Sequence, residues 1–246
     1  MSPTLGRSVS AVAIAGLPEV RAGDDLAALL RPHVADGDVL VVAHKVVSKA
    51  EGRVVRLDDV VAGDEARRLA AEQGKDPRQV QVVLDESEEL LRAERGVLIC
   101  RTRHGFVCAN AGVDASNAEP GTLVLLPLDP DASARRLRAQ VNPRAAVVVA
   151  DSFGRAWRHG QVDVAIGVAG LAPLDDWRGR TDSTGNALRA TWIAVADQAA
   201  SAADLARRKD SREPAVVVRG LDAYVTAEDG PGAQSLVRPP NEDLFR

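Results

Sequence analysis

The chain has 246 residues, of which 46% are hydrophobic and 27% charged, and its formal net charge is -4. This composition excludes a disordered tail, a collagen-like rod and a membrane protein. The mild acidity and the lack of a basic block in the sequence argue against nucleic acid or an anionic membrane as the main partner, because both need a concentrated positive surface. We therefore expect a globular protein that acts on small molecules. The N-terminal sequence indicates neither a signal peptide nor a membrane-spanning helix, so we expect the protein in the cytoplasm.

Short runs rich in valine and isoleucine alternate with segments of helical periodicity along the chain. The predicted strands are 39–43, 97–100, 122–126, 146–150, 162–168, 193–196 and 215–218. The predicted helices are 24–30, 64–73, 77–93, 132–140 and 197–208. This alternation predicts a mixed α/β (α+β) fold.

The domain organisation follows from shifts in composition. The acidic helical stretch 62–95 reads as an excursion between two strand-rich parts, which predicts one unit over 1–246 built from two intimately joined lobes. The end of the chain, 228–246, is rich in glycine, proline and charge, and we expect it to be flexible. Cys100 and Cys108 match no zinc spacing and give a weak disulfide signal, so they are interpreted as small buried hydrophobes.

Lysine is scarce in this chain, and two of the four lysines follow one apolar strand. His44, Lys45 and Lys49 come directly after the predicted strand 39–43. Cations and amide donors at the end of a strand in an α/β protein are typical of phosphate binding. The order of a Walker motif is missing. An edge strand carrying solvated charges would use the same residues, so both interpretations stay open.

A loop of small residues at 110–117 carries one carboxylate and two carboxamides. Its small side chains allow a ligand to approach the backbone, and Asp114 offers the oxygen ligands that Mg²⁺ or Mn²⁺ prefers. A plain turn stabilised by Asx hydrogen bonds would use the same residues.

A second carboxylate, Asp151, follows the predicted strand 146–150 and is itself followed by Ser152. A carboxylate beside a hydroxyl at the end of a buried strand is a frequent arrangement for holding a metal against phosphates. Arg155 and Arg158 come next at i, i+3 spacing, which would place them on one helix face to grip an anionic substrate. A helix N-cap is the alternative for the Asp-Ser pair. Together the three segments predict a metal-assisted site for polyanions, suited to phosphoryl transfer.

The same segments resemble the coenzyme F(420)-0:γ-glutamyl ligase family, including the N-terminal domain of its two-domain actinobacterial member. The resemblance runs through 16–19, 23–26, 36–39, 48–53, 114–117, 128–131, 154–158 and 216–220, in order and over nearly the whole chain. The ending 238–245 is similar to the point where the fused actinobacterial form passes into a flavin-binding domain.

The resemblance implies a GTP-dependent ligase of coenzyme F(420) biosynthesis, acting as a homodimer with Mg²⁺ or Mn²⁺. The γ-phosphoryl of GTP would activate the phospholactyl carboxylate of coenzyme F(420)-0 as an acyl phosphate, which L-glutamate attacks. Carried over by position, the implied nucleotide contacts are Leu17, Pro18, Glu19, Val20, His44, Lys45, Lys49, Asn117 and Lys209. The implied metal ligands are Asp114, Asp151 and Ser152, the implied catalytic residues are Asp114, Asp151 and Lys49, and Arg155 and Arg158 would contact the substrate.

Three departures from the family pattern matter for function. His44-Lys45 stands where relatives commonly have Ser-Thr or Ser-Lys, and 205–214 replaces a glycine-rich loop that closes over the nucleotide. Ser152 stands where the family usually has Thr, a mild change that keeps the hydroxyl. Lys209 falls near a position that offers an oxygen to a second metal, and a protonated lysine cannot coordinate a cation. Its charge would then substitute for that ion, or Asp210 or Glu213 would take over as ligand, or this member is impaired. The alternatives to the ligase are a non-catalytic GTP-binding paralogue and a related ligase with a different carboxylate acceptor.

Overall fold

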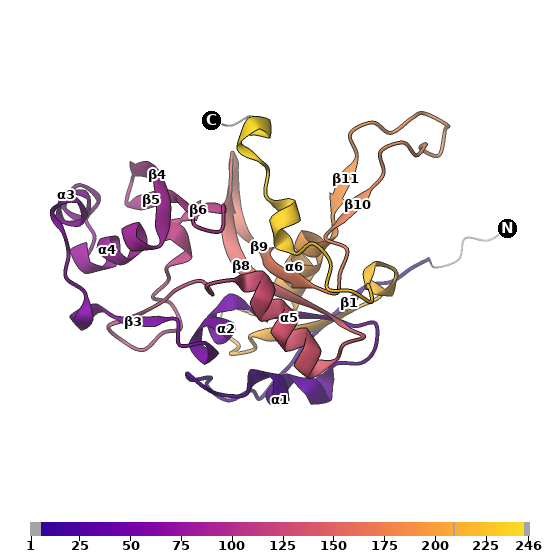
Figure 1. Ribbon diagram of the computed structural model, residues 1–246, viewed down its shortest axis with the longest axis horizontal. Coiled ribbons are helices and arrows are strands. Elements are labelled where there is room, and N and C mark those ends of the chain that lie inside the picture. The colour runs from indigo at the N-terminus through magenta and orange to yellow at the C-terminus, as the bar shows by residue number, and fades with distance from the viewer. Residues whose placement is uncertain (1–5, 209, 244–246) are drawn as a thin grey trace.

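The computed structural model describes residues 6–208 and 210–243, and its centre is a five-stranded sheet (Figure 1). The strand order is β1-β12-β2-β8-β9, and only β2 and β8 are parallel neighbours. These strands are β1 (Ser10–Ala13), β12 (Ala215–Arg219), β2 (Val39–Ala43), β8 (Ala146–Arg155) and β9 (Arg158–Ala169). The mixed α/β fold predicted from the sequence is confirmed.

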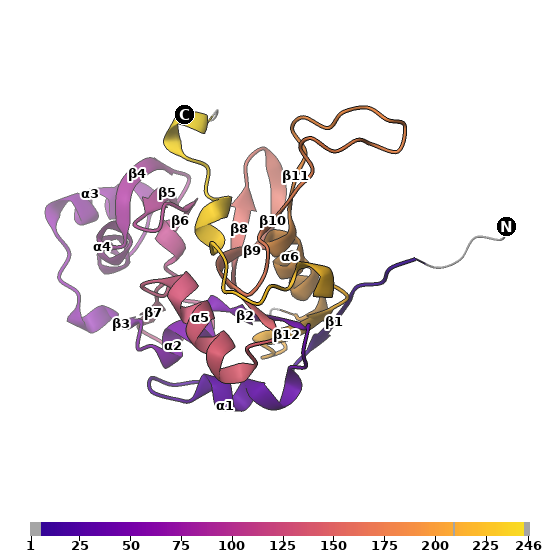
Figure 2. The same ribbon diagram turned by 45° about the vertical axis from the view of Figure 1, so that its right-hand side comes forward.

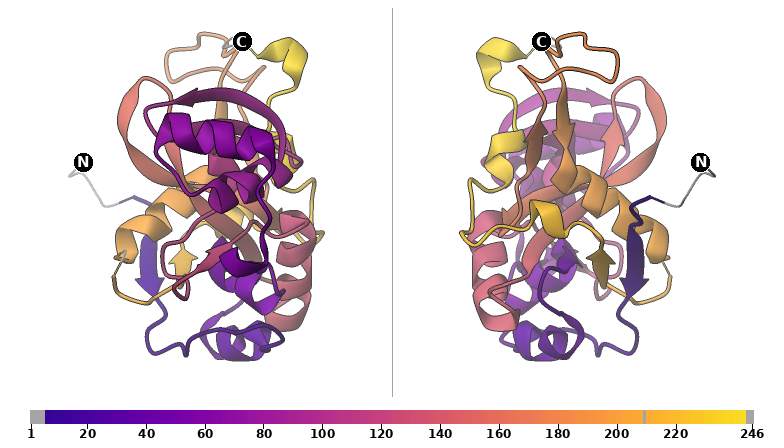
Figure 3. Two further views of the ribbon diagram at one scale, coloured as in Figure 1. Left: turned by 90° about the vertical axis from the view of Figure 1, so that its left-hand side faces the viewer. Right: turned by 90° about the vertical axis from the view of Figure 1, so that its right-hand side faces the viewer.

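Helices cover both faces of this sheet (Figure 3). One face packs against α1 (Leu26–Leu30), α2 (His44–Ala50) and α5 (Pro130–Val141), and the other against α6 (Val195–Ala206). Because both faces are covered, β2 is apolar at every position instead of alternating, and Val39 to Val42 are completely buried. The alanines of α6 let that helix lie close to the strands.

A separate hydrophobic cluster is formed by the chain between β2 and α5. It contains α3 (Asp64–Gln73), α4 (Pro77–Asp85) and the antiparallel strands β4 (Ser87–Glu94), β5 (Val97–Thr102) and β6 (Val107–Ala109). The short pair β3 (Val54–Arg56) and β7 (Thr122–Val124) lies next to it (Figure 2). Cys100 and Cys108 are register partners on β5 and β6, and both are free and buried, as predicted. The division into two lobes stays a prediction.

The remaining elements are short. A two-stranded arm of β10 (Leu174–Asp176) and β11 (Trp192–Ala194) carries the connection 177–191 away from the body of the protein (Figure 2). Short 3-10 turns occur at Arg31–His33, Leu57–Asp59, Asn110–Gly112, Asp222–Tyr224, Ala233–Leu236 and Pro240–Glu242. Within the described ranges, no helix is long and apolar enough to cross a bilayer.

Two local predictions and one of the open alternatives were wrong. The predicted helix 77–93 ends at Asp85, and its second half is β4, because pairing with β5 outweighs the helical preference of its glutamates and leucines. The segment after β2 is the helix α2 and not an edge strand. Arg155 and Arg158 lie at a strand turn, where Trp157 has a φ of 57°, so the i, i+3 spacing does not place them on a helix.

The C-terminal segment packs onto the body through two buried charged side chains. Arg138 donates to four backbone carbonyls, two of them at residues 226 and 227, and forms an ion pair with Asp229 at 2.7 Å. Asp131 accepts hydrogen bonds from the backbone of Val168 and Ala233, each at 2.7 Å. These contacts join residues 226 to 233 to the body of the protein, and the flexibility of 228–246 stays a prediction.

Candidate functional site

The candidate site lies where the parallel strands β2 and β8 end together. Ala43 and Ala150 are register partners, so His44 at the start of α2 and Asp151 on β8 both follow the last paired residue of the parallel ladder. The carboxyl ends of parallel strands in an α/β sheet form the usual binding crevice of such folds. The two segments singled out from the sequence therefore meet at one edge of the sheet.

His44 faces Asp151 from the interior of the protein. Its side chain is 2% exposed, and its Nε2 lies 3.3 Å from Asp151 Oδ1, close enough for an ion pair but without the alignment of a hydrogen bond. Its Nδ1 is 3.4 Å from the hydroxyl of Ser48 one turn later. The ring is directed at the Asp151 carboxylate and not at the surface. The contact of His44 with a nucleotide stays a prediction.

Lys45 holds the carboxylate of Asp114. The Nζ atom lies 2.7 Å from Asp114 Oδ2 and donates to Ser116 Oγ at 2.5 Å. Asp114 Oδ1 also accepts from the backbone N–H of Ser116 at 2.6 Å. Burial opposes ionisation of Asp114, but the hydrogen bonds from Lys45 and Ser116 outweigh it and lower the pKa of this carboxyl. Asp114 is therefore a carboxylate at neutral pH.

Lys49 lies one helical turn after Lys45 and reaches the end of the same loop. Its Nζ donates to Glu19 Oε1 at 2.5 Å and to the backbone oxygen of Asn117 at 2.8 Å. The Lys49 side chain is 14% exposed, whereas that of Glu19 is 70% exposed. The structure thus brings together Glu19, Lys49 and Asn117, three of the residues predicted to contact a nucleotide.

The neighbours of Glu19 differ in exposure. Leu17 packs against the core, Val20 is buried, and Pro18 is exposed. These residues belong to the connection between β1 and α1. Lys209, the last predicted nucleotide contact, lies outside the described residues.

Ser152 and Asp151 point to opposite faces of β8. Val149 and Phe153 pack with the α5 face and Ala150 with the α6 face, so Asp151 shares the α5 face and Ser152 the α6 face. The Ser152 hydroxyl donates to Asp163 Oδ1 at 2.6 Å on that second face. In this arrangement the two side chains do not converge on one point.

The predicted substrate-binding arginines lie further along the same strand. Arg155 and Arg158 are exposed at the turn of the β8–β9 hairpin, and Arg155 donates to the backbone oxygen of His159 at 2.6 Å. Arg155 is four residues beyond Asp151 on β8. Their role toward a substrate stays a prediction.

The donors available for a divalent cation are two carboxylates that each face a basic side chain. Over 6–208 and 210–243, no group of three His, Cys, Asp or Glu side chains is placed to hold a metal ion. Mg²⁺ is commonly bound in proteins by one or two carboxylates, with waters and substrate phosphates as the other ligands. Asp114 and Asp151 have the donor chemistry for that mode of binding, and their role as metal ligands stays a prediction.

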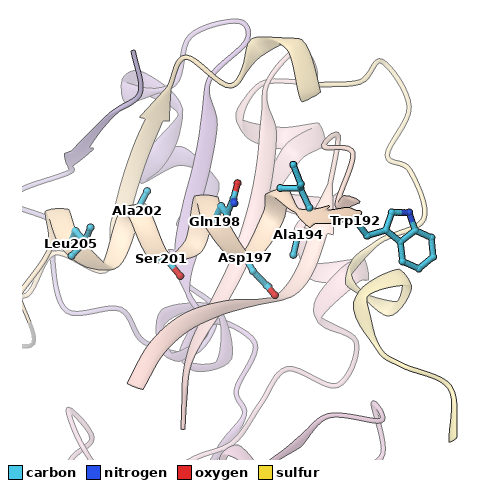
Figure 4. A pocket seen from close by; sticks show the side chains of 8 residues that line it. Trp192, Ala194, Asp197, Gln198, Ser201, Ala202 and Leu205 are labelled. Atoms are coloured by element: carbon cyan, nitrogen blue, oxygen red, sulfur yellow. The ribbon is translucent and has the colours of Figure 1, made fainter. Parts of the chain in front are cut away.

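A wide groove runs along α6 and β11, away from these residues (Figure 4). It has a volume of about 580 Å³, and Trp192, Asp197, Ser201 and Leu205 lie along it. A second hollow of about 320 Å³ lies between α1, α2 and α5, with Glu51 and Arg136 in its wall. Neither hollow includes Lys45, Lys49, Asp114 or Asp151.

Asp197 in the groove gives a prediction about stability. Burial raises the pKa of this carboxyl, although a hydrogen bond from the backbone N–H of Ala165 opposes the shift. A raised folded-state pKa means that the folded protein holds the proton more tightly, so stability falls as pH rises from the unfolded-state pKa through the folded-state one. Asp197→Asn keeps the acceptor oxygen and removes the charge. We expect it to flatten this slope and to gain less than about 1 kcal/mol at pH 7.

Urea unfolding of both proteins at pH 4 and pH 7 measures this effect. Asp36→Asn is the control of opposite sign, because hydrogen bonds from Arg144 and Asn142 lower the pKa of the Asp36 carboxyl. A wild-type protein whose stability does not fall relative to Asp197→Asn over this range would contradict the assignment.

Two charged residues near the site were not predicted. Asp163 is completely buried on β9 and forms an ion pair with Arg207 at the end of α6. The sequence signal for Asp163 was a carboxylate inside an otherwise apolar strand, which needs a partner when buried. The partner could not be named, because 44 residues separate the two.

A sheet with lysines and carboxylates gathered at the carboxyl ends of parallel strands is typical of α/β proteins that bind anionic ligands. Residues 15–220 match the model of the family described as F420-0:Gamma-glutamyl ligase, and the chain belongs to this family. It is 42% identical to the coenzyme F420:L-glutamate ligase of Methanothermobacter thermautotrophicus, over 97% of this chain and 99% of that protein. It is 45% identical to the protein of that name from Methanopyrus kandleri, over 93% of this chain and 94% of the relative. It is 43% identical to the protein of that name from Archaeoglobus fulgidus, over 95% of this chain and 94% of that protein.

Proposed function

We propose that this protein joins L-glutamate to the carboxylate of the coenzyme F420 precursor in a reaction that consumes GTP. Family membership supports the ligase activity. The observation that carries the GTP assignment is the position of Lys45 and Lys49, one helical turn apart on α2 and both directed at the 114–117 loop. Two ammonium groups at a strand end suit the phosphates of a nucleotide.

The proposed reaction has two steps. The acceptor carboxylate attacks the γ-phosphorus of GTP, which forms an acyl phosphate and releases GDP. The amine of L-glutamate then attacks the acyl carbon, loses a proton and displaces inorganic phosphate. Because phosphoryl transfer is catalysed mainly by positioning and by neutralising charge, the cationic side chains account for much of the expected effect.

The contacts of the lysines in the free protein suggest how they would accept a nucleotide. Lys49 would exchange the exposed carboxylate of Glu19 for a phosphate oxygen, and it would keep the backbone oxygen of Asn117. Lys45 would stay beside Asp114, close to the negative charge of the phosphates. Leu17, Pro18 and Val20 would border the nucleotide through the connection that carries Glu19.

A divalent cation, Mg²⁺ or Mn²⁺, would be held by Asp114 and Asp151. When bound, the cation neutralises phosphate charge and orients the phosphates for attack. Asp151 would be oriented by His44 behind it and by the backbone N–H of Ser152, which donates to Asp151 Oδ1 at 2.8 Å. Arg155 and Arg158 would contact the anionic acceptor from the hairpin turn. We also propose that the protein acts as a homodimer in the cytoplasm.

Mass spectrometry of a complete reaction tests this proposal. The protein is incubated with GTP, Mn²⁺, L-glutamate and coenzyme F(420)-0, and the expected products are GDP and the glutamylated coenzyme. Omitting L-glutamate should abolish the product, and ATP in place of GTP should give less of it. Folded protein that binds GTP but forms no product would overturn the ligase and favour a non-catalytic GTP-binding paralogue.

A further inference from the structure

One guanidinium group joins two strands of the central sheet that are not neighbours. Arg207 follows the last residue of α6, and its Nη2 forms an ion pair with the carboxylate of Asp163 on β9. Its Nη1 donates to the backbone oxygen of Pro214 at 2.9 Å, immediately before β12. In the strand order β12-β2-β8-β9, this side chain therefore links the first strand to the fourth.

The two middle strands are tied to the same network. The backbone N–H of Ala43, at the end of β2, donates to the Pro214 oxygen at 2.8 Å. The hydroxyl of Ser152, on β8, donates to Asp163 Oδ1 at 2.6 Å. The two groups that Arg207 contacts, the Pro214 oxygen and the Asp163 carboxylate, thus accept hydrogen bonds from Ala43 and Ser152. These two residues lie beside the candidate site, because Ala43 precedes His44 and Ser152 follows Asp151.

The environment of this ion pair is unusual for a surface connection. Asp163 is completely buried, and the Arg207 side chain is 11% exposed. A buried ion pair often adds little net stability compared with apolar side chains of similar size, because desolvation offsets the attraction. Stability alone therefore does not explain why Arg207 and Asp163 are paired at this position. A role in positioning the strand ends does explain it.

We propose that Arg207 is a positioning residue that fixes the connection from α6 to β12 against the sheet and holds the ends of β2 and β8 together. Its consequence for catalysis rests on the proposed function, since Asp151 and α2 follow these strand ends. A planar guanidinium can serve two acceptors at once, whereas an ammonium group lacks this geometry. Arg207→Lys therefore keeps the charge beside Asp163 and weakens the link to Pro214.

Hydrogen exchange of the ligand-free protein tests the anchor directly. In Arg207→Met, we expect backbone exchange at Ala43, whose N–H donates to the Pro214 oxygen, and at Ser152 to rise about tenfold, with the rest of the central sheet unchanged. Arg207→Lys should give an intermediate rise. Arg144→Met is the matched control, because Arg144 forms an exposed ion pair with Asp36 in another part of the protein. In the ligase assay, kcat should fall about tenfold in Arg207→Met and recover partly in Arg207→Lys.

The outcomes separate this proposal from the proposed function. Exchange in folded Arg207→Met that is unchanged at Ala43 and Ser152, or raised evenly over the whole sheet, overturns the positioning role. If Arg207→Met does not fold, the same two readouts in Arg207→Lys decide. A wild-type protein without ligase activity refutes the proposed function, while the exchange measurement still decides whether Arg207 anchors the connection.

Discussion

Asp151→Asn is expected to lower ligase turnover about a hundredfold to a thousandfold, and to weaken Mn²⁺ binding in parallel. The substitution keeps the size of the side chain and an oxygen that can accept the hydrogen bond from the Ser152 N–H. What it removes is the negative charge that faces His44 and that would hold the cation. Loss of function with an intact fold is therefore the expected combination.

Steady-state kinetics with GTP and electron paramagnetic resonance of bound Mn²⁺ check this prediction. Asp36→Asn is the control, because its carboxylate is 55% exposed and pairs with Arg144 outside the site. The control should retain wild-type turnover. Full activity in Asp151→Asn would refute the assignment of Asp151 as a metal ligand.

His44 gives Asp151 an environment that the family pattern alone would not have suggested. A buried imidazole lies behind the carboxylate where relatives are expected to have a hydroxyl residue, and its other nitrogen is beside Ser48. A buried ring that lies against a carboxylate restricts the orientations open to that group. The departure at His44 is thus compatible with a well-ordered Asp151, and it does not by itself indicate an impaired enzyme.

The sequence predicted the lysine and carboxylate segments because each of them is local. Lys45 and Lys49 follow a strand with a clear apolar run, and β2 extends over the predicted range 39–43. The loop with Asp114 and Asn117 is recognisable from composition alone. Their meeting at one sheet edge then follows from the parallel pairing of β2 and β8.

The features that the sequence did not predict depend on strand order. β4 has residues that favour a helix, and it is a strand only because β5 pairs with it. The contact of Arg207 with Asp163 requires α6 to end beside β9, which no local pattern encodes. The opposite directions of Asp151 and Ser152 follow from the continuation of β8 through both residues, where a helix N-cap was the alternative.

Lys49→Met is expected to weaken GTP binding by about 2–3 kcal/mol, or roughly 30-fold to 150-fold, with little change in stability. The ammonium group lies between the Glu19 carboxylate and the Asn117 backbone oxygen. Because the Glu19 side chain is 70% exposed, water can solvate it when Lys49 is removed. The free protein therefore loses little, whereas a bound phosphate would lose a charged partner. Isothermal titration calorimetry with GTP and thermal unfolding measure the two effects separately.

Lys75→Met is the matched control, since Lys75 follows α3 and belongs to the part of the chain with the separate hydrophobic cluster. Like Lys49→Met, Lys75→Met replaces one lysine and removes one positive charge. It should leave the affinity for GTP unchanged. Equal losses of affinity in the two variants would mean that net charge, and not the position of Lys49, governs binding. Affinity that survives Lys49→Met would remove Lys49 from the nucleotide site and leave Lys45 as the cation of α2 that faces the 114–117 loop.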